Sequence, residues 1–156
     1  MHVIIVGAGI AGLSLAIALG QSRHQVTILD AAPELTELGA GVQMTPQAIR
    51  YLFKWGLRGD LLAESINPEN LHVWDGQGGS LLGPLRIKDM EAQYGAPYIV
   101  VHRAVLHSIL HRHAIRAGAQ LLLNSDVVEY DFANGAVQLR NGKRLTADLV
   151  VAADGA

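Results

Sequence analysis

The sequence contains no cysteine, little charge and no long uninterrupted apolar run. Without cysteine the chain cannot form disulfide bonds or thiolate metal sites, and it has no cysteine nucleophile. The 12 basic and 14 acidic residues give a net charge of −2, which argues against the basic surface of a nucleic-acid or anionic-membrane binder. Four glycines interrupt the apolar N-terminus and no Lys or Arg precedes it, which disfavours a signal peptide or membrane helix.

The remaining composition is typical of a single α/β core. The chain has 156 residues, of which 50% are hydrophobic, and this is enough apolar material for one compact core. We therefore expect a soluble, cytoplasmic protein with no nucleic-acid and no membrane partner.

The most informative segment is glycine-rich and lies between a predicted strand and a predicted helix. Gly7, Gly9 and Gly12 follow the apolar run 3–6 and open a stretch of good helix formers. A second apolar run, 26–29, ends on Asp30. A strand, a glycine turn, a helix, a second strand and a terminal acid together form the dinucleotide-binding fingerprint.

Each position of the fingerprint has a physical task. Gly7 permits the tight turn, Gly9 lacks a Cβ that would block a pyrophosphate, and Gly12 lets the helix pack closely on the sheet. Asp30 follows at the spacing of roughly 20 residues at which an acid accepts hydrogen bonds from ribose hydroxyls. Its charge would repel a 2′-phosphate, which predicts FAD or NAD rather than NADP. The alternative for Asp30 is a solvated residue at a strand end.

The rest of the chain predicts further strands and helices. Thr45 and Pro46 begin a helix that Gly56 ends, and a shorter helix is expected over 60–65. The sequence also predicts a hairpin of 71–74 with 80–82, an irregular stretch 86–97, a strand 98–101, a helix 103–117, a strand 120–123, and an antiparallel meander of 127–132, 136–140 and 143–146 with Asn-Gly turns.

A last apolar strand, 149–153, ends on Asp154 and Gly155. Ligands bind open α/β sheets at the carboxyl ends of the strands. If this strand lies beside 3–6, Asp154 is expected next to the glycine-rich loop.

These motifs, in this order, resemble those of a known family. The chain carries Gly7 to Gly12, Asp30, the run Gly39-Ala40-Gly41-Val42-Gln43, the run His102-Arg103-Ala104-Val105-Leu106-His107, and Asp154-Gly155. Together they resemble the single-component (group A) FAD-dependent aromatic monooxygenases of the salicylate hydroxylase-like group. The resemblance covers the whole chain and implies a Rossmann-like FAD-binding domain, with a parallel sheet, crossover helices and a β-meander.

The resemblance also implies roles for particular residues. It places the FAD pyrophosphate on Gly7, Gly9 and Gly12, and the adenosine ribose on Asp30 with Ala31. The remaining implied contacts are Gly41 and Val42 along the ribityl chain or flavin edge, Arg103 at the diphosphate or ribityl region, Val128 beside the adenine, and Asp154-Gly155 shared by FAD and a transient NADPH or NADH.

The family's usual ribose acid is Glu, so Asp30 is one methylene shorter. The family also continues beyond Asp154-Gly155 with a substrate portion that contains a Gly-Asp motif. Residues 1–156 are therefore expected to be the N-terminal part of the FAD-binding domain, truncated before the substrate domain is complete and inactive alone. Such a part would expose apolar surface and would either bind FAD weakly or need a partner that supplies the missing C-terminal complement. The complete enzyme would hydroxylate a small aromatic substrate with O2, and no catalytic residue is assigned within 1–156.

Other interpretations remain open at this point. His107 and His111 have a spacing that could ligate zinc, but a polar helix face explains them better, and no metal site is expected. The chain could also be a non-catalytic or degenerate FAD- or NAD-binding module. An amine oxidase or NAD-dependent reductase could share the first motif, although Gly39 to Gln43 and Asp154-Gly155 favour a hydroxylase.

Overall fold

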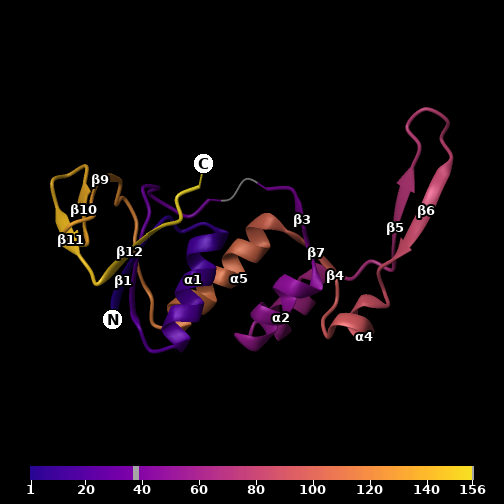
Figure 1. Cartoon of the computed structure of the whole chain (residues 1–156), viewed down its shortest axis with the longest axis horizontal. Helices are drawn as coiled ribbons and strands as arrows, with labels where there is room; N and C mark the ends of the chain where they lie inside the picture. Colours follow the sequence, from indigo (N-terminus) through magenta and orange to yellow (C-terminus); the bar gives the residue numbers. More distant parts are fainter. Residues whose placement is uncertain (37–38, 156) are drawn as a thin grey trace. The chain divides into compact units, whose positions relative to one another are not determined.

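The structure is a computed structural model that describes residues 1–36 and 39–155. The chain forms two compact units, of which the first comprises Met1–Leu38 with Leu106–Ala156 and the second comprises Gly39–Val105. The helices are α1 (Ile10–Gln21), α2 (Pro46–Lys54), α3 (Arg58–Ala63), α4 (Met90–Tyr94) and α5 (Arg103–Arg116) (Figure 1). The strands are β1 (His2–Val6), β2 (Gln25–Leu29), β3 (Gly41–Met44), β4 (Ser65–Ile66), β5 (Asn70–Trp74), β6 (Leu81–Arg86), β7 (Ile99–His102), β8 (Gln120–Leu122), β9 (Val127–Asp131), β10 (Ala136–Leu139), β11 (Arg144–Thr146) and β12 (Leu149–Ala152).

The first unit is built on a parallel sheet with the strand order β12-β1-β2-β8. The last strand pairs with the first in register, with Val3 opposite Leu149 and Val6 opposite Ala152. This confirms that the strand predicted at 149–153 lies beside the one predicted at 3–6. Because β1 is central and covered on both faces, Val3 and Ile4 are buried alike, as the continuous apolar run predicts.

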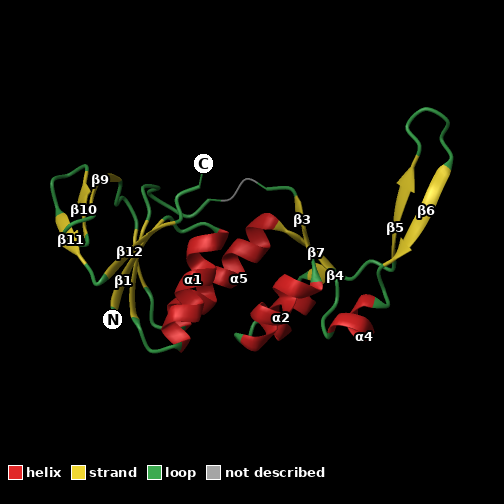
Figure 2. Ribbon diagram, viewed as in Figure 1, coloured by secondary structure: helices red, strands yellow, loops and turns green. Residues whose placement is uncertain are grey.

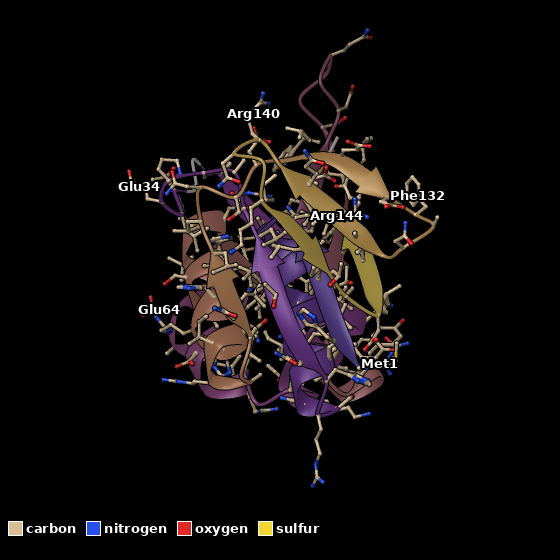
Figure 3. The ribbon with its side chains drawn as sticks, turned by 90° about the vertical axis from the view of Figure 1, so that its left-hand side faces the viewer. Met1, Glu34, Glu64, Phe132, Arg140 and Arg144 are labelled. Atoms are coloured by element: carbon tan, nitrogen blue, oxygen red, sulfur yellow. The ribbon has the colours of Figure 1, made fainter. Side chains whose placement is uncertain are left out.

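Helices cover one face of this sheet and a β-meander covers the other (Figure 2). On one face, Ile5 of β1 points toward α1, since a Cβ built on Gly12 of α1 would lie 3.3 Å from the Cγ2 atom of Ile5. On the other face, Ile4 of β1 packs with Val137 and Leu139 of the antiparallel meander β11-β10-β9. The meander strands cross in front of the parallel strands in Figure 3. The predicted parallel sheet, crossover helices and meander are thus confirmed.

The second unit contains a three-stranded antiparallel sheet, β3-β7-β4, and the β5–β6 hairpin. The hairpin and α2 were predicted, but β3 and β4 were not. Both strands are short and half-exposed, so their apolar pattern is weak, and their pairing with β7 joins segments far apart in sequence. The stretch 86–97, predicted to be irregular, contains α4, a helix of 5 residues that Gly95 ends in the left-handed conformation. Such a short helix has no detectable periodicity.

Within the described residues, no helix is both long and apolar enough to cross a membrane.

Candidate functional site

The glycine-rich loop leaves β1 against the end of β12. Gly7 has a φ of +106°, which favours glycine. A Cβ on Gly7 would overlap the carbonyl oxygen of Ala153 and would lie 2.8 Å from the Cα of Asp154. The Gly7 N–H donates to the carbonyl oxygen of Leu29 at 2.7 Å. Only glycine therefore allows the loop to lie between β2 and β12.

The next two glycines differ in what surrounds them. A Cβ on Gly12 would overlap the carbonyl oxygen of Gly7, so the helix begins in direct contact with the loop. A Cβ on Gly9 would meet no protein atom within 4 Å. Gly9 is the N-cap of α1, no side chain caps this end, and the first turn holds no acidic residue. The open space at Gly9 therefore lies at a helix N-terminus whose N–H groups and partial positive charge favour an anion.

Asp30 is held against the loop by two backbone hydrogen bonds. Its Oδ2 accepts from the Ala8 N–H at 2.7 Å, and its Oδ1 accepts from the Ala32 N–H at 2.9 Å. Asp30 is partly buried, which argues against the alternative that it is a freely solvated residue at a strand end. Each carboxylate oxygen has a second lone pair, which leaves acceptor sites for the hydroxyls of a ligand.

A pocket of about 160 Å³ lies beside Asp30 at the carboxyl ends of the parallel strands. Its lining residues come from β1, β2, the start of β9 and the segments that follow β1, β2, β8 and β12: Val6, Gly7, Leu29, Asp30, Ala31, Ser125, Asp126, Val127 and Asp154. The predicted position of Asp154 beside the glycine-rich loop is therefore confirmed. Burial and, secondarily, the negative charge of Asp154 raise the pKa of the Tyr130 hydroxyl. The pocket thus brings three aspartates, Asp30, Asp126 and Asp154, together with Gly7 of the glycine-rich loop.

The segment after β8 forms a wall of this pocket that the sequence analysis missed. The Ser125 N–H donates to the Asp30 carbonyl oxygen at 2.8 Å, and the Asn124 N–H donates to that of Ala32 at 3.0 Å. Asn124 has a φ of +51°. The signal was the turn-forming run Asn124-Ser125-Asp126 directly after a predicted strand, because such a run lies at the sheet edge where ligands bind.

Val128 does not line this pocket, whereas its neighbour Val127 does. Successive side chains of a strand point to opposite faces, and Val128 is 49% exposed. The proposed contact of Val128 with adenine therefore remains a prediction. A second hollow of about 290 Å³ shares Ala31 and Asp126 with the first pocket and is bounded by Asn124, Leu139, Arg140 and Asn141.

Three predicted site residues belong to the second unit. Gly41 of β3 lies opposite His102 of β7, Val42 follows it in β3, and the Arg103 N–H donates to the Ala40 carbonyl oxygen at 3.1 Å. The structure thus brings Gly41 and Arg103 close to each other. The remaining predicted residues, from Gly7 to Ala31 and from Val128 to Gly155, belong to the first unit.

His107 corrects one prediction. It was assigned to a polar helix face, yet it is only 5% exposed. Its Nε2 lies 2.7 Å from the carbonyl oxygen of Ala8, in the glycine-rich loop. The sequence could not reveal this contact, because the two residues are 99 positions apart. Among the residues that the structure describes, no group of His, Asp and Glu is arranged to hold a metal ion.

The expected exposure of apolar surface is found beside the meander. Phe132, at the end of β9, is 92% exposed (Figure 3), and Leu149 of β12 is 46% exposed. Both line an apolar hollow of about 330 Å³ with Tyr130 and Val150.

Known proteins resemble the chain over 99% of its length. The FAD-dependent monooxygenase OpS4 of Beauveria bassiana is 37% identical, and the match covers 37% of that protein. The 3-hydroxybenzoate 6-hydroxylase 1 of Aquipseudomonas alcaligenes is 30% identical, with 40% of it covered. The solved tetrameric form of 2-methyl-3-hydroxypyridine-5-carboxylic acid oxygenase is 30% identical with a TM-score of 0.87, and 39% of its chain is covered. CtdE in complex with FAD and a substrate is 28% identical with a TM-score of 0.82, and 38% of its chain is covered.

The chain thus spans about two fifths of the length of these relatives. A family model described as an FAD binding domain matches residues 1–156. Since that model matches the full length, the chain belongs to the FAD binding domain family, and its cofactor is FAD.

Proposed function

We propose that this chain is the FAD-binding part of an NAD(P)H-dependent monooxygenase that hydroxylates a small aromatic or phenolic molecule with O2. The observation that carries the proposal is the arrangement in the first unit, where Asp30 and Asp154 line one pocket with Gly7, and where Gly9 of the same loop is the N-cap of α1. The names of two relatives support the substrate class, since one is a 3-hydroxybenzoate 6-hydroxylase and another, from Streptomyces cremeus and 33% identical, is a 3-amino-4-hydroxybenzoate 2-monooxygenase.

The residues fit FAD in three respects. The space beside Gly9 leaves room for the pyrophosphate, because no protein atom lies within 4 Å of a Cβ built there. The first N–H groups of α1 would donate to phosphate oxygens, with Gly7 and Gly12 allowing the loop to lie close to them. Asp30 would accept hydrogen bonds from the adenosine ribose hydroxyls, with Ala31 beside it.

The other contacts are assigned by the same proposal. Gly41 and Val42 would lie along the ribityl chain or flavin edge, and Arg103 would contact the diphosphate or ribityl region. Val128 would border the adenine. Asp154 and Gly155 would contact FAD and a transiently bound NADPH or NADH.

The bound flavin would supply the redox chemistry, which comprises reduction by the nicotinamide and reaction with O2. The residues of this chain would bind and orient it. We assign no catalytic residue here, and we assign residues 1–156 to the N-terminal part of the FAD-binding domain. Binding of the aromatic substrate would fall to the part of the relatives outside the match, as a C-terminal complement.

The test is flavin retention by the purified 156-residue chain. The protein is incubated with FAD and desalted, and its absorption spectrum is recorded. Bands near one equivalent of flavin would support FAD binding by this chain alone, and a colourless protein would contradict it and show that the C-terminal complement is required.

Asp30→Ala should release the flavin, because it removes the ribose acceptor. Asp75→Ala is the matched control, since the Asp75 carboxylate likewise accepts two backbone N–H bonds, from Gln77 at 3.0 Å and Gly78 at 2.9 Å, in the β5–β6 turn. If both variants retain flavin equally, the role assigned to Asp30 is wrong. Retention of NAD in place of FAD would favour a nucleotide-binding module of another kind.

A further inference from the structure

His107 is a buried polar residue to which the proposed function assigns no task. It lies on α5, is 5% exposed, and neighbours Leu106 and Leu110, which are fully buried. Buried polar groups are almost always hydrogen-bonded, and here the Nε2 atom lies 2.7 Å from the Ala8 carbonyl oxygen. The ring therefore ties α5 to the glycine-rich loop, which α5 meets beside α1 (Figure 1).

The partner determines which nitrogen carries the proton. A carbonyl oxygen can only accept, so the Nε2 of His107 must be the donor. A neutral His107 ring is consequently the tautomer with its proton on Nε2.

The two peptide groups on either side of Ala8 form hydrogen bonds to side chains from different parts of the fold. The Ala8 N–H, in the peptide after Gly7, donates to the Asp30 Oδ2 at 2.7 Å. The Ala8 carbonyl, in the peptide before Gly9, accepts from His107. Ala8 itself is 1% exposed, so water does not replace either partner readily.

The second anchor sets the direction of the Gly9 N–H. Within the described residues no peptide bond is cis, and the C=O and N–H of a trans peptide point to opposite sides. Because His107 holds the Ala8 carbonyl toward α5, the N–H of Gly9 points away from α5. Gly9 is the N-cap of α1, where a Cβ would meet no protein atom within 4 Å.

We propose that His107 is a positioning residue of the phosphate-binding loop, which holds the Ala8 carbonyl and thereby aims the Gly9 N–H at the FAD pyrophosphate. This inference rests on the proposed placement of the pyrophosphate at Gly9. Asp30 and His107 act as a pair, since each orients one of the peptides that flank Ala8.

The first test needs no FAD. In the ¹⁵N-labelled 156-residue chain, long-range ¹H–¹⁵N correlations should show His107 with a protonated Nε2. The alternative tautomer, with a bare Nε2, would overturn the proposal. Residual dipolar couplings then report the orientation of the Gly9 N–H directly.

The variants separate the hydrogen bond from simple filling of space. His107→Gln can place an amide N–H near the position of Nε2, whereas His107→Asn is too short and His107→Leu has no donor. We expect the Gly9 coupling of the Gln variant to match the wild type, and those of the Asn and Leu variants to differ. The dissociation constant for FAD should rise about tenfold or more in the Asn and Leu variants, as for a misaligned charge-assisted hydrogen bond, and recover in the Gln variant.

Folded Leu and Asn variants with an unchanged Gly9 coupling and unchanged FAD affinity would overturn the proposal. If these two variants do not fold, the Gln variant decides, because loss of the Gly9 orientation in a folded Gln variant overturns it as well. A wild-type chain that does not bind FAD would contradict the proposed function alone, while the tautomer and the Gly9 coupling still decide whether His107 positions the loop.

Discussion

Gly9 and Gly12 allow ligand binding to be separated from folding, because the same added methyl group meets different surroundings. At Gly9 a Cβ meets no protein atom within 4 Å, and the backbone is extended with a φ of −73°. Alanine adopts this conformation readily. Because alanine leaves the unfolded chain fewer conformations than glycine does, it stabilises the folded state by about 0.4–1 kcal/mol. Alanine is a poorer N-cap than glycine, and this lowers the stability of the folded state by a similar amount, about 0.5–1 kcal/mol. Gly9→Ala should therefore change the free energy of unfolding by less than about 1 kcal/mol.

At Gly12 the balance is different. Alanine gains about 1 kcal/mol of helix propensity there. However, its Cβ would overlap the carbonyl oxygen of Gly7 and lie 3.3 Å from the Ile5 side chain, and such overpacking costs about 1–3 kcal/mol. We expect the upper end of this range, because the overlapped atom belongs to the backbone and cannot rotate away. The free energy of unfolding of the Gly12→Ala variant should therefore be about 2 kcal/mol lower than that of the wild type.

The assay is urea unfolding together with an FAD titration. Gly9→Ala should unfold like the wild type and yet bind FAD at least about tenfold more weakly, a loss of roughly 1.4 kcal/mol, because its methyl group enters the space assigned to the pyrophosphate. Gly59→Ala is the control, since its Cβ also meets nothing within 4 Å but lies in α3. Undiminished FAD affinity in Gly9→Ala would refute the placement of the phosphates at Gly9.

Two further predictions concern stability. Gly20→Ala should lower the free energy of unfolding by about 1–2 kcal/mol in urea titrations, because its Cβ would lie 2.9 Å from the Cβ of Ala117 and overlap the Ala117 carbonyl oxygen. An unchanged unfolding midpoint would contradict the packing of α1 against the residue that follows α5. Hydrogen bonds from Asn134 and Arg144 lower the pKa of Asp131 below 3.8. Since the folded state lowers this pKa, the stabilisation by Asp131 is present above pH 3.8 and lost as the pH falls below it. The difference in unfolding midpoint between the wild type and Asp131→Asn should therefore shrink below that pH, and a constant difference would refute the linkage.

Much of the first unit could be predicted from sequence because its signals are local. The run 3–6 is apolar at every position, which indicates a strand covered on both faces, and it is β1 of the central sheet. Gly7 and Gly12 mark a turn and a close contact that no other residue allows. The Asn-Gly pairs likewise marked both turns of the meander, where Gly135 and Gly142 have positive φ.

Elements whose partners are distant could not be predicted in the same way. β3 and β4 have little apolar pattern of their own and exist as strands because β7 supplies their hydrogen bonds. The pocket wall at Ser125 depends on a hydrogen bond to the carbonyl oxygen of Asp30, which follows β2 in a distant part of the sequence. Val128 illustrates the same limit. Val127 and Val128 point to opposite faces of β9, and the sequence does not show which face turns toward the parallel sheet and the pocket.

The sequence by itself determined the dinucleotide fingerprint, the order of the main elements and the acid at the end of β2, because these depend on backbone conformation and on apolar periodicity over a few residues. Only the tertiary structure decided that β12 pairs with β1, on which the predicted position of Asp154 depended, and that His107 is buried against the Ala8 carbonyl. The physical reason is that a buried polar side chain must find its hydrogen-bond partner, and folding brings that partner from a part of the chain that local sequence does not specify.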